Sequence, residues 1–332
     1  MTMSTPAIIT VAITGAIPRK KDTPAVPVTP SEQIKSTHAA YEAGASVTHI
    51  HVRNPDETPS SDPKLFAQVG EGIAKHCPGM IIQFSTGGRG RQQNERGAML
   101  VLRPSLATGS VNFPAQIYEN PPQLVEDLAR SMPANNVKPE IEVFDAAMLY
   151  NAKAMADRGL LKRPCQVQFV MGIPNALPAR RKLLDSLVGE LKEIMPDATW
   201  SAAGLARHQL DVNRWCLEMG GHLRTGLEDN IKFDKDRLAK ATRSSWHGLP
   251  ASAASTVGTP QAAARRGKFS GCRRPEDRRV KNEREKRNGT GNDQDGSRCA
   301  TFDRHYRGRQ RDRHHDRMVR LFPVQHDDGA CA

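Results

Sequence analysis

Two histidines separated by one residue, His49 and His51, are the first pair in the chain whose type and spacing suit catalysis. They stand at the end of an apolar run, and side chains two residues apart on a β-strand point to the same face. Two imidazoles and a carboxylate are a common donor set for a catalytic zinc ion, which keeps a further position open. Glu228 is the candidate for the third ligand. The alternative is a pair of polar histidines inside the fold that bind no metal.

A turn rich in hydroxyls and glycine, Ser85–Gly88, directly follows the apolar run Ile81–Phe84. Glycines such as Gly87 and Gly88 let backbone N–H groups approach an anion, and the hydroxyls add further donors. The turn therefore predicts a site for a carboxylate or a phosphate. The alternative is a tight turn that needs glycine only for a positive φ.

Charged residues also interrupt or follow two later apolar runs. Glu140 and Glu142 alternate along one run, and Arg224 precedes the acidic pair Glu228 and Asp229 after the last run. A guanidinium can bind a carboxylate through two parallel hydrogen bonds. We therefore expect Arg224 to bind either Asp229 or the carboxylate of a substrate. The alternative is an ordinary ion pair on the surface.

The elements that must position these residues follow a regular alternation in residues 1–240. The short apolar runs, rich in β-branched residues, are Ile8–Ala12, Val47–Val52, Met80–Phe84, Leu106–Phe113, Glu140–Phe144, Val167–Met171, Ala198–Ala202 and His222–Leu227. The segments with helical spacing between them are Pro30–Ala43, Pro63–His76, Pro122–Ser131, Ala146–Arg158, Ala179–Met195 and Ala206–Met219. Several begin at Pro, Ser, Thr or Asp, and Gly44, Gly159 and Gly220 follow three of them as stop signals.

Alternating strands and helices predict a parallel sheet in an α/β fold. Eight strand candidates within the first 240 residues match the size of a (β/α)8 TIM barrel. Catalytic groups of such a barrel lie at the carboxyl ends of the strands, which is where this sequence has its polar clusters. The alternative, a doubly wound open sheet, usually has fewer strands and a phosphate-loop signature that the sequence lacks.

Seven motifs in chain order resemble the β-keto acid cleavage enzymes, a family that includes the 3-keto-5-aminohexanoate cleavage enzyme. The motifs are TVAITGA at 10–16, AGASVTHIHVR at 43–53, IQFSTGG at 82–88, GSVNF at 109–113, PEIE at 139–142, QFVMG at 168–172 and GGHLRTGLEDN at 220–230. The resemblance extends over residues 6 to 240 and implies a (β/α)8 barrel. It also implies a reaction in which a β-keto acid and acetyl-CoA give acetoacetate and a new acyl-CoA.

The resemblance further implies a divalent metal, normally zinc, held by His49, His51 and Glu228. As a Lewis acid, the metal would polarise the keto oxygen of the substrate and stabilise the negative charge that develops there. Relatives of this kind form tetramers, so we expect a homo-oligomer. The partners expected from the resemblance are therefore a small β-keto acid, acetyl-CoA and further copies of the chain.

A base is the second requirement of this chemistry. By resemblance Asp229, paired with Arg224 and supported by Glu142, corresponds to the group that removes the proton next to the ketone. The resulting carbanion would attack the thioester of acetyl-CoA, and a retro-Claisen cleavage would follow. The enzyme class implied is an acyltransferase that breaks a carbon–carbon bond.

The resemblance assigns the substrate's carboxylate to Ser85, Gly87 and Gly88, and two departures from the family pattern stand out. The stretch before the fourth strand is shorter than in the family, and Ser105 is the nearest match there to a substrate-binding hydroxyl. Ile17 occupies the position of an acidic residue in members that cleave the amino-bearing acid. A buried ammonium would have no partner beside Ile17. We therefore expect an uncharged or less polar β-keto acid.

The net charge of +12 is concentrated at one end of the chain. Residues 1–240 contain 28 Lys and Arg against 25 Asp and Glu, whereas residues 241–332 contain 20 against 11. The second segment also has only ten Leu, Ile, Val, Phe and Met residues. We therefore expect a catalytic barrel domain at 1–240, and at 241–332 an irregular basic tail that is disordered.

The resemblance to the family stops after Lys240, and the final helix of a barrel is not recognisable there. A shift of reading frame is the favoured interpretation, because another frame across residues 245–260 can encode an apolar helical spacing; sequencing codons 235–262 would test it. Loss of that helix would uncover the barrel wall and impair the protein. A genuine disordered extension and a nucleic-acid-binding arm are the alternatives. Aromatic residues are sparse in the tail (Phe302 and Tyr306), so nucleic acid is not an expected partner.

Other classes of protein are disfavoured by the composition. No run of about 18 apolar residues occurs, so we expect no membrane span. The first residues lack the pattern of a secretion signal, and the six cysteines have no paired spacing. We therefore expect free thiols and a cytoplasmic enzyme. The remaining functional alternatives are another metal-dependent barrel, such as an aldolase or a hydrolase, and a nucleic-acid-binding protein that acts through the tail.

Overall fold

A computed structural model describes residues 7–85, 105–134 and 137–242. All of them belong to the first of two compact units into which the chain divides, residues 1–273. The predicted basic tail and the final barrel helix fall on residues that lie almost entirely outside the described part. The domain boundary at residue 240 and the frame-shift interpretation therefore stay predictions.

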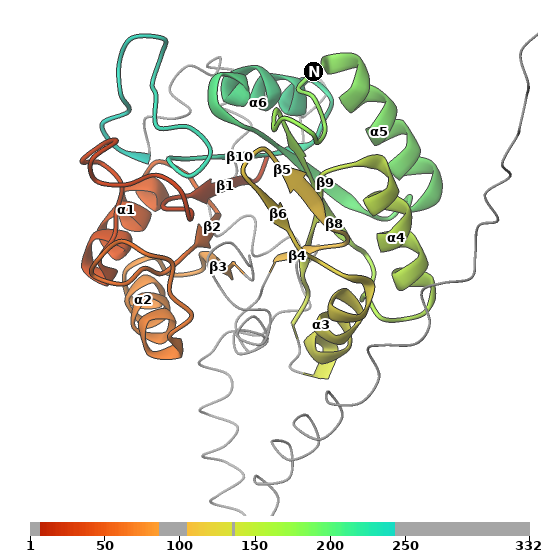
Figure 1. Ribbon diagram of the computed structural model, residues 1–332, viewed down its shortest axis with the longest axis horizontal. Coiled ribbons are helices and arrows are strands. Elements are labelled where there is room, and N and C mark those ends of the chain that lie inside the picture. Colours follow the sequence, from red (N-terminus) through yellow and green to blue (C-terminus); the bar gives the residue numbers. More distant parts are fainter. Residues whose placement is uncertain (1–6, 86–104, 135–136, 243–332) are drawn as a thin grey trace, which may run out of the picture. The chain divides into compact units, whose positions relative to one another are not determined.

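Eight parallel strands form one sheet in the order β3-β2-β1-β10-β9-β8-β7-β4, shown in Figure 1. The strands are β1 (Ile9–Ala12), β2 (Val47–Ile50), β3 (Ile81–Phe84), β4 (Ser105–Ala107), β7 (Glu140–Val143), β8 (Gln166–Met171), β9 (Thr199–Gly204) and β10 (His222–Thr225). Strands of this sheet that follow one another in the chain are neighbours except β3 and β4, which are the two ends of the order among the described residues, and the last strand, β10, pairs with the first. This cyclic order belongs to a barrel and not to a doubly wound sheet, so the predicted (β/α)8 fold is confirmed.

The helices surround the strands on the outside, as Figure 1 shows. They are α1 (Pro30–Glu42), α2 (Pro63–His76), α3 (Pro122–Ala134), α4 (Ala146–Asp157), α5 (Arg181–Ile194) and α6 (Gln209–Glu218), with a short 3-10 turn, η2 (Ala206–His208), before α6. The expected start signals act as caps. Thr29 and Glu32 form a capping box at α1, and the side chains of Asp62 and Asp145 cap α2 and α4.

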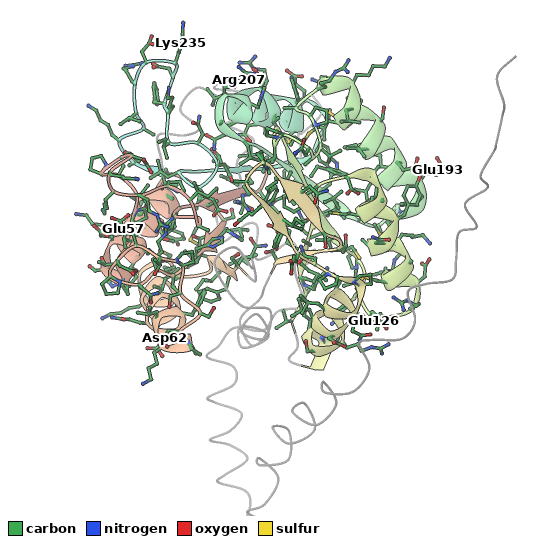
Figure 2. The ribbon with its side chains drawn as sticks, viewed as in Figure 1. Glu57, Asp62, Glu126, Glu193, Arg207 and Lys235 are labelled. Carbon is green, nitrogen blue, oxygen red and sulfur yellow. The ribbon has the colours of Figure 1, made fainter. Side chains whose placement is uncertain are left out.

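The two faces of the strands have different roles. Outward-pointing apolar residues pack under the helices; the rings of Phe66 on α2 and Phe84 on β3, for example, meet edge to face at 5.0 Å. The inward face is polar and buried, and its residues are His49, Gln83, Glu140, Glu142, Gln166, Gln168, Ser201 and Arg224. Charged side chains such as Glu193 and Lys235 project away from the barrel in Figure 2. A buried polar interior of this kind needs a chemical reason.

One predicted strand was wrong. The run Leu106–Phe113 is not one strand, because β4 takes only its first two residues. The remainder, β5 (Val111–Phe113), pairs antiparallel with β6 (Gln116–Tyr118) in a separate hairpin. The hydroxyl of Thr108 donates to the carbonyl oxygen of Met148 at 2.7 Å, which draws the chain toward α4 and out of the sheet.

The described residues bear on two expectations, that the cysteines are free thiols and that no helix spans a membrane. Cys77, Cys165 and Cys216 are buried free thiols, as predicted, and burial raises the pKa of Cys216 to about 12. Cys272, Cys299 and Cys331 lie outside the described residues. Within the described part of the chain, every helix is too short or too polar to cross a bilayer.

Candidate active site

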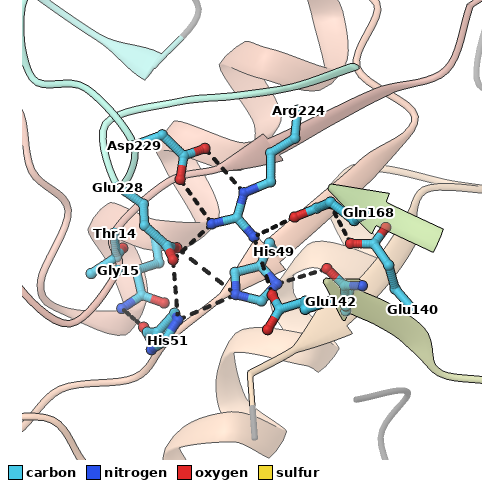
Figure 3. Close-up of polar contacts among 12 residues, drawn as sticks. Thr14, Gly15, His49, His51, Glu140, Glu142, Gln168, Arg224, Glu228 and Asp229 are labelled. Carbon is cyan, nitrogen blue, oxygen red and sulfur yellow. Dashed lines mark hydrogen bonds and ion pairs between the residues drawn. The ribbon is translucent and has the colours of Figure 1, made fainter. Parts of the chain in front are cut away.

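His49, His51 and Glu228 come together at the carboxyl ends of the strands, as Figure 3 shows. The Nε2 atoms of the two histidines are 3.2 Å apart. Nε2 of His51 lies 3.5 Å from Oε1 of Glu228, and Nε2 of His49 lies 3.9 Å from its Oε2. Neighbouring ligands of a tetrahedral zinc ion, with bonds of about 2.0–2.1 Å, are about 3.3 Å apart. The three predicted ligands are thus close to the spacing that one cation requires.

Strand β1 is what brings these residues together. His49 is in register with Ala12 of β1, and the backbone N–H of Glu228 donates to the carbonyl oxygen of the same Ala12 at 3.1 Å. Two glycines permit the approach. A Cβ on Gly226 would overlap the carbonyl group of Ala12, and a Cβ on Gly15 would lie 2.5 Å from Cγ of Glu228. Both glycines have a positive φ, which side chains disfavour.

The donor set also has the protonation state that a cation needs. Nδ1 of His49 donates to the amide oxygen of Gln83 at 2.7 Å, so Nε2 of the neutral ring carries a lone pair. Burial, with the charges of Arg224 and His51, lowers the pKa of His49 to about 3, and the charge of Glu228 opposes this shift. Oε2 of Glu228 is buried and has no hydrogen-bond partner among the described residues. An unsatisfied carboxylate oxygen that faces imidazole nitrogens fits a divalent cation.

Arg224 links this triad to the second predicted acid. Its Nε and Nη2 donate to the two carboxylate oxygens of Asp229 at 3.0 and 2.9 Å, and Nη2 also donates to Glu228 at 2.8 Å. Its Nη1 donates to Gln168 at 3.3 Å and lies 3.6 Å from Oε1 of Glu142. The predicted pairing of Arg224 with Asp229 is therefore present, and it is buried. Burial opposes ionisation of Glu228, but Arg224 and the histidines hold its pKa well below its ordinary value.

The other two acids have raised pKa values. Burial raises the pKa of Asp229, the charge of Glu228 adds to the effect and Arg224 opposes it. Burial likewise raises the pKa of Glu142 to about 7, with Arg224 opposing and the carboxylates of Glu140, Glu228 and Asp229 adding. A carboxylate with a raised pKa is a stronger base, which suits proton abstraction near neutral pH.

Three interior residues join the site without having been given a role from the sequence. Gln83 and Gln168 both hydrogen bond to Glu140, while Gln83 also contacts His49 and Gln168 also contacts Arg224. Burial raises the pKa of Glu140, and Arg224 and the two amides oppose it. The available signal was a polar residue at an inward position of an otherwise apolar strand. That signal does not reveal which atoms meet.

The predicted substrate-binding residues are described only in part. Ser85 is buried directly after β3, and its backbone N–H donates to the carbonyl oxygen of Ile50 at 3.0 Å. Gly87 and Gly88 lie outside the described residues. Ser105 is buried at the amino end of β4, in register with Glu140, and is thus deeper in the barrel than the other candidates. Substrate contacts at these positions stay predictions.

A cationic corner, formed by Arg19 and Arg53, lies beside the triad. Arg53 is buried, and its guanidinium donates to backbone carbonyl oxygens, including that of Gly15 at 2.7 Å. Nη1 of Arg19 is buried and has no hydrogen-bond partner within the described part of the chain. Burial and, to a smaller extent, the charge of Arg19 lower the pKa of Arg53 to about 10. Two guanidinium groups therefore lie close together, and Ile17 is exposed in the same segment.

Comparison with known proteins agrees with this geometry. A model of the beta-keto acid cleavage enzyme family matches residues 6–256. The 3-oxoadipate:acetyl-CoA acetyltransferase of Cupriavidus necator is 58% identical over 240 residues, which are 71% of this chain and 84% of the relative. The 3-keto-5-aminohexanoate cleavage enzyme of Fusobacterium nucleatum subsp. nucleatum is 39% identical over 239 residues, or 70% and 86% of the two chains.

A solved structure supports the fold. The apo structure of ObcA superposes with a TM-score of 0.61 at 20% identity, over 66% of this chain and 60% of ObcA. At that identity the likeness concerns the barrel alone. The curated relatives, by contrast, are 58% and 39% identical and are named as an acetyl-CoA acetyltransferase and a keto acid cleavage enzyme. The chain therefore belongs to the beta-keto acid cleavage enzyme family and is an acyltransferase, as its motifs predicted.

Proposed function

We propose that this enzyme condenses a β-keto acid with acetyl-CoA and releases acetoacetate and a new acyl-CoA, with a divalent cation, zinc in the first instance, at His49, His51 and Glu228. One observation carries the proposal. The buried Oε2 of Glu228 lacks a hydrogen-bond partner in the part of the chain that the structure describes and lies 3.9 Å from Nε2 of His49, while Arg224 ties the same carboxylate to Asp229. The guanidinium group of Arg224 thus binds both a ligand of the proposed cation site and the proposed base.

The chain's own residues would handle the proton. Asp229 takes it from the carbon between the carboxylate and the ketone of the substrate, and Arg224 keeps Asp229 oriented through two hydrogen bonds. Glu142, whose pKa is raised to about 7, lies on the other side of the guanidinium group of Arg224 and supports it there. A cation on the triad would supply Lewis-acid polarisation of the substrate's oxygens.

The bond changes then balance. The deprotonated carbon attacks the thioester carbon of acetyl-CoA, and the CoA thiolate leaves. The thiolate attacks the original ketone, and the bond between that carbon and the former α carbon breaks. The electron pair of this bond returns to acetoacetate, which recovers the proton from Asp229, and the rest of the substrate departs as acyl-CoA. Ser85, Gly87, Gly88 and Ser105 are the proposed contacts for the substrate's oxygens.

The substrate proposed is a dicarboxylic β-keto acid such as 3-oxoadipate. Ile17 offers no partner to an ammonium, and by itself it favours an uncharged acid. The relative at 58% identity, however, is named for 3-oxoadipate, which carries a second carboxylate. Arg19, with its unpartnered Nη1 beside Arg53, supplies a group that could bind this carboxylate. The cationic corner therefore favours the dicarboxylic acid.

The test of substrate class compares three acids of the same chain length, 3-oxoadipate, 3-oxohexanoate and 3-keto-5-aminohexanoate, with acetyl-CoA and the full-length protein. Acetoacetate should form fastest from 3-oxoadipate. The variant R19Q should lower kcat/KM for 3-oxoadipate at least about tenfold more than for 3-oxohexanoate, because only the former loses an ion pair. Equal turnover of all three acids, or an equal effect of R19Q on both, would refute the dicarboxylic proposal.

The test of the cation site measures bound metal in the purified protein together with acetoacetate formation. We expect about one divalent ion per chain, and loss of both metal and activity in H49Q and in E228Q. The variant H38Q changes a solvent-exposed histidine on α1 and should retain both. Full activity of H49Q without bound metal would contradict the proposal.

A further inference from the structure

A continuous chain of buried polar contacts runs through the barrel interior from the metal triad to Arg224, as Figure 3 shows in part. Nδ1 of His49 donates to the oxygen of Gln83, and the side chain of Gln83 bonds to Glu140. Nε2 of Gln168 donates to the same Glu140, and its oxygen accepts from Nη1 of Arg224. Glu140 is therefore the midpoint between the two halves of the candidate site.

We propose that Glu140 is a positioning residue that fixes the orientation of both amides, and through them the tautomer of His49 and the direction of Arg224. Both consequences rest on the proposed function: that for catalysis on the proposed reaction, and that for cation binding only on the proposed cation site. Glu140 lies level with Gln166 of β8, one inward layer below Glu142. We expect no contact with substrate at this depth.

Donors and acceptors must match along this chain of contacts. A primary amide has one acceptor end and one donor end, whereas an ionised carboxylate, the form of Glu140 that Arg224 and the two amides favour against burial, only accepts. Because Glu140 accepts from both neighbours, Gln83 and Gln168 must each turn their NH2 group toward it and their oxygen away. The outward oxygen of Gln83 then requires a proton on Nδ1 of His49, which leaves Nε2 free to bind a cation.

A neutral amide at position 140 has one oxygen where the carboxylate has two, so it cannot offer each neighbour an oxygen of its own. It would accept from one of them and would have to donate to the other, which must then rotate by half a turn. If Gln83 rotates, its NH2 faces Nδ1 of His49 and drives the ring proton to Nε2, which closes the cation site. If Gln168 rotates, its NH2 faces the guanidinium of Arg224, donor against donor.

A plain electrostatic role is the rival explanation, because the charge of Glu140 also interacts with that of Arg224. The barrel offers a matched pair of positions that separates the two. Gln168 stands in the contact chain, whereas Gln166 is level with Glu140 but bonds to Thr199 and Ser201 on β9. When Glu140 is changed to glutamine, a carboxylate can therefore be put back into the barrel interior either at position 168, within the chain of contacts, or at position 166, beside it.

The experiment compares E140Q with the double variants E140Q/Q168E and E140Q/Q166E in the full-length protein. Zinc affinity is measured by chelator competition, and kcat is measured with the best substrate. In E140Q/Q168E the new carboxylate accepts from Arg224 and from the new amide, whose oxygen accepts from Gln83, so every donor again meets an acceptor. E140Q/Q166E restores the charge but not this order.

We expect E140Q to weaken zinc binding or to lower kcat by about 10- to 100-fold, the usual range for residues that orient metal ligands. E140Q/Q168E should recover most of either loss, and E140Q/Q166E should not. Equal rescue by both double variants would overturn the proposal in favour of charge alone. Unchanged zinc affinity and kcat in E140Q would overturn it as well.

Single changes at the two amides keep the proposal testable if E140Q fails to fold. Q83L should weaken zinc binding, because His49 loses its partner, whereas Q168L should weaken it less and should lower kcat through Arg224. Similar zinc affinities in Q83L and Q168L would refute the proposal. Zinc affinity is measured without substrate, so this test of the positioning role of Glu140 remains valid if the proposed reaction is not observed.

Discussion

Arg224 binds Asp229 through two parallel hydrogen bonds, Nε to Oδ2 at 3.0 Å and Nη2 to Oδ1 at 2.9 Å, and both side chains are buried. The same Nη2 donates to Glu228 at 2.8 Å. The proposed base and a proposed metal ligand are therefore held by one planar group. Their geometry depends on the fork of that group as well as on its charge.

The variant R224K tests this dependence, because lysine keeps the charge and loses the fork. We expect kcat to fall by about 100-fold or more and zinc affinity to fall less, since Asp229 loses its fixed orientation. R181K is the control, because Arg181 forms exposed ion pairs with Asp185 and Glu218 far from the barrel interior. An R224K enzyme with the kcat of the parent would show that charge alone suffices.

Two glycines allow a test of how closely β1 approaches the metal triad. Gly15 has a φ of 64° and Gly159 a φ of 73°, so alanine at either position is strained by about 1–2 kcal/mol. At Gly15 the new Cβ would also meet a neighbour, Cγ of Glu228 at 2.5 Å, whereas at Gly159 no described residue has an atom within 4 Å. Because Arg224 binds the carboxylate of Glu228, this side chain cannot turn aside freely to make room for the new Cβ. G15A must therefore shift the proposed ligand from its position.

We therefore expect G15A and G159A to lower the melting temperature, while only G15A lowers zinc affinity, by about tenfold or more. Differential scanning calorimetry and chelator competition on the two proteins provide the comparison. If G15A bound zinc as tightly as G159A, Glu228 would not be a ligand whose position matters.

Much of the fold could be predicted because local signals and global topology agree. The helix Pro63–His76 was predicted to its last residue, since Asp62 and Pro63 mark its start. The run Leu106–Phe113 misled because apolar content does not show where a chain leaves a sheet. That exit depends on the contact of Thr108 with Met148, which are distant in sequence.

The candidate site, too, could be predicted from the sequence only in part. His49, His51 and Glu228 could be proposed as neighbours because barrel topology places their strand ends together. The pKa of Glu142 could not be predicted, since it depends on how deeply the barrel buries the carboxyl group. Nor could the role of Gln83, because a sequence shows a polar residue but not which end of its amide faces which partner.

The raised pKa of Glu142 predicts a specific dependence of stability on pH. The folded protein holds this proton up to about pH 7, whereas the ordinary pKa of the group is 4.5. Between these two values the folded state binds more protons than the unfolded state, so Glu142 lowers the free energy of unfolding as the pH rises. The loss amounts to about 3 kcal/mol once the pH exceeds 7.

E142Q removes this titration, so its melting temperature minus that of the parent should increase from about pH 4.5 to about pH 7 and then level off. Thermal denaturation of both proteins between these limits and up to pH 8.5 measures the difference, in which the titration of all other groups largely cancels. E193Q, at a solvent-exposed position of α5, should give a curve parallel to that of the parent. A parallel curve for E142Q would mean that its carboxyl group is already ionised at low pH, and that Arg224 outweighs burial at the centre of the site.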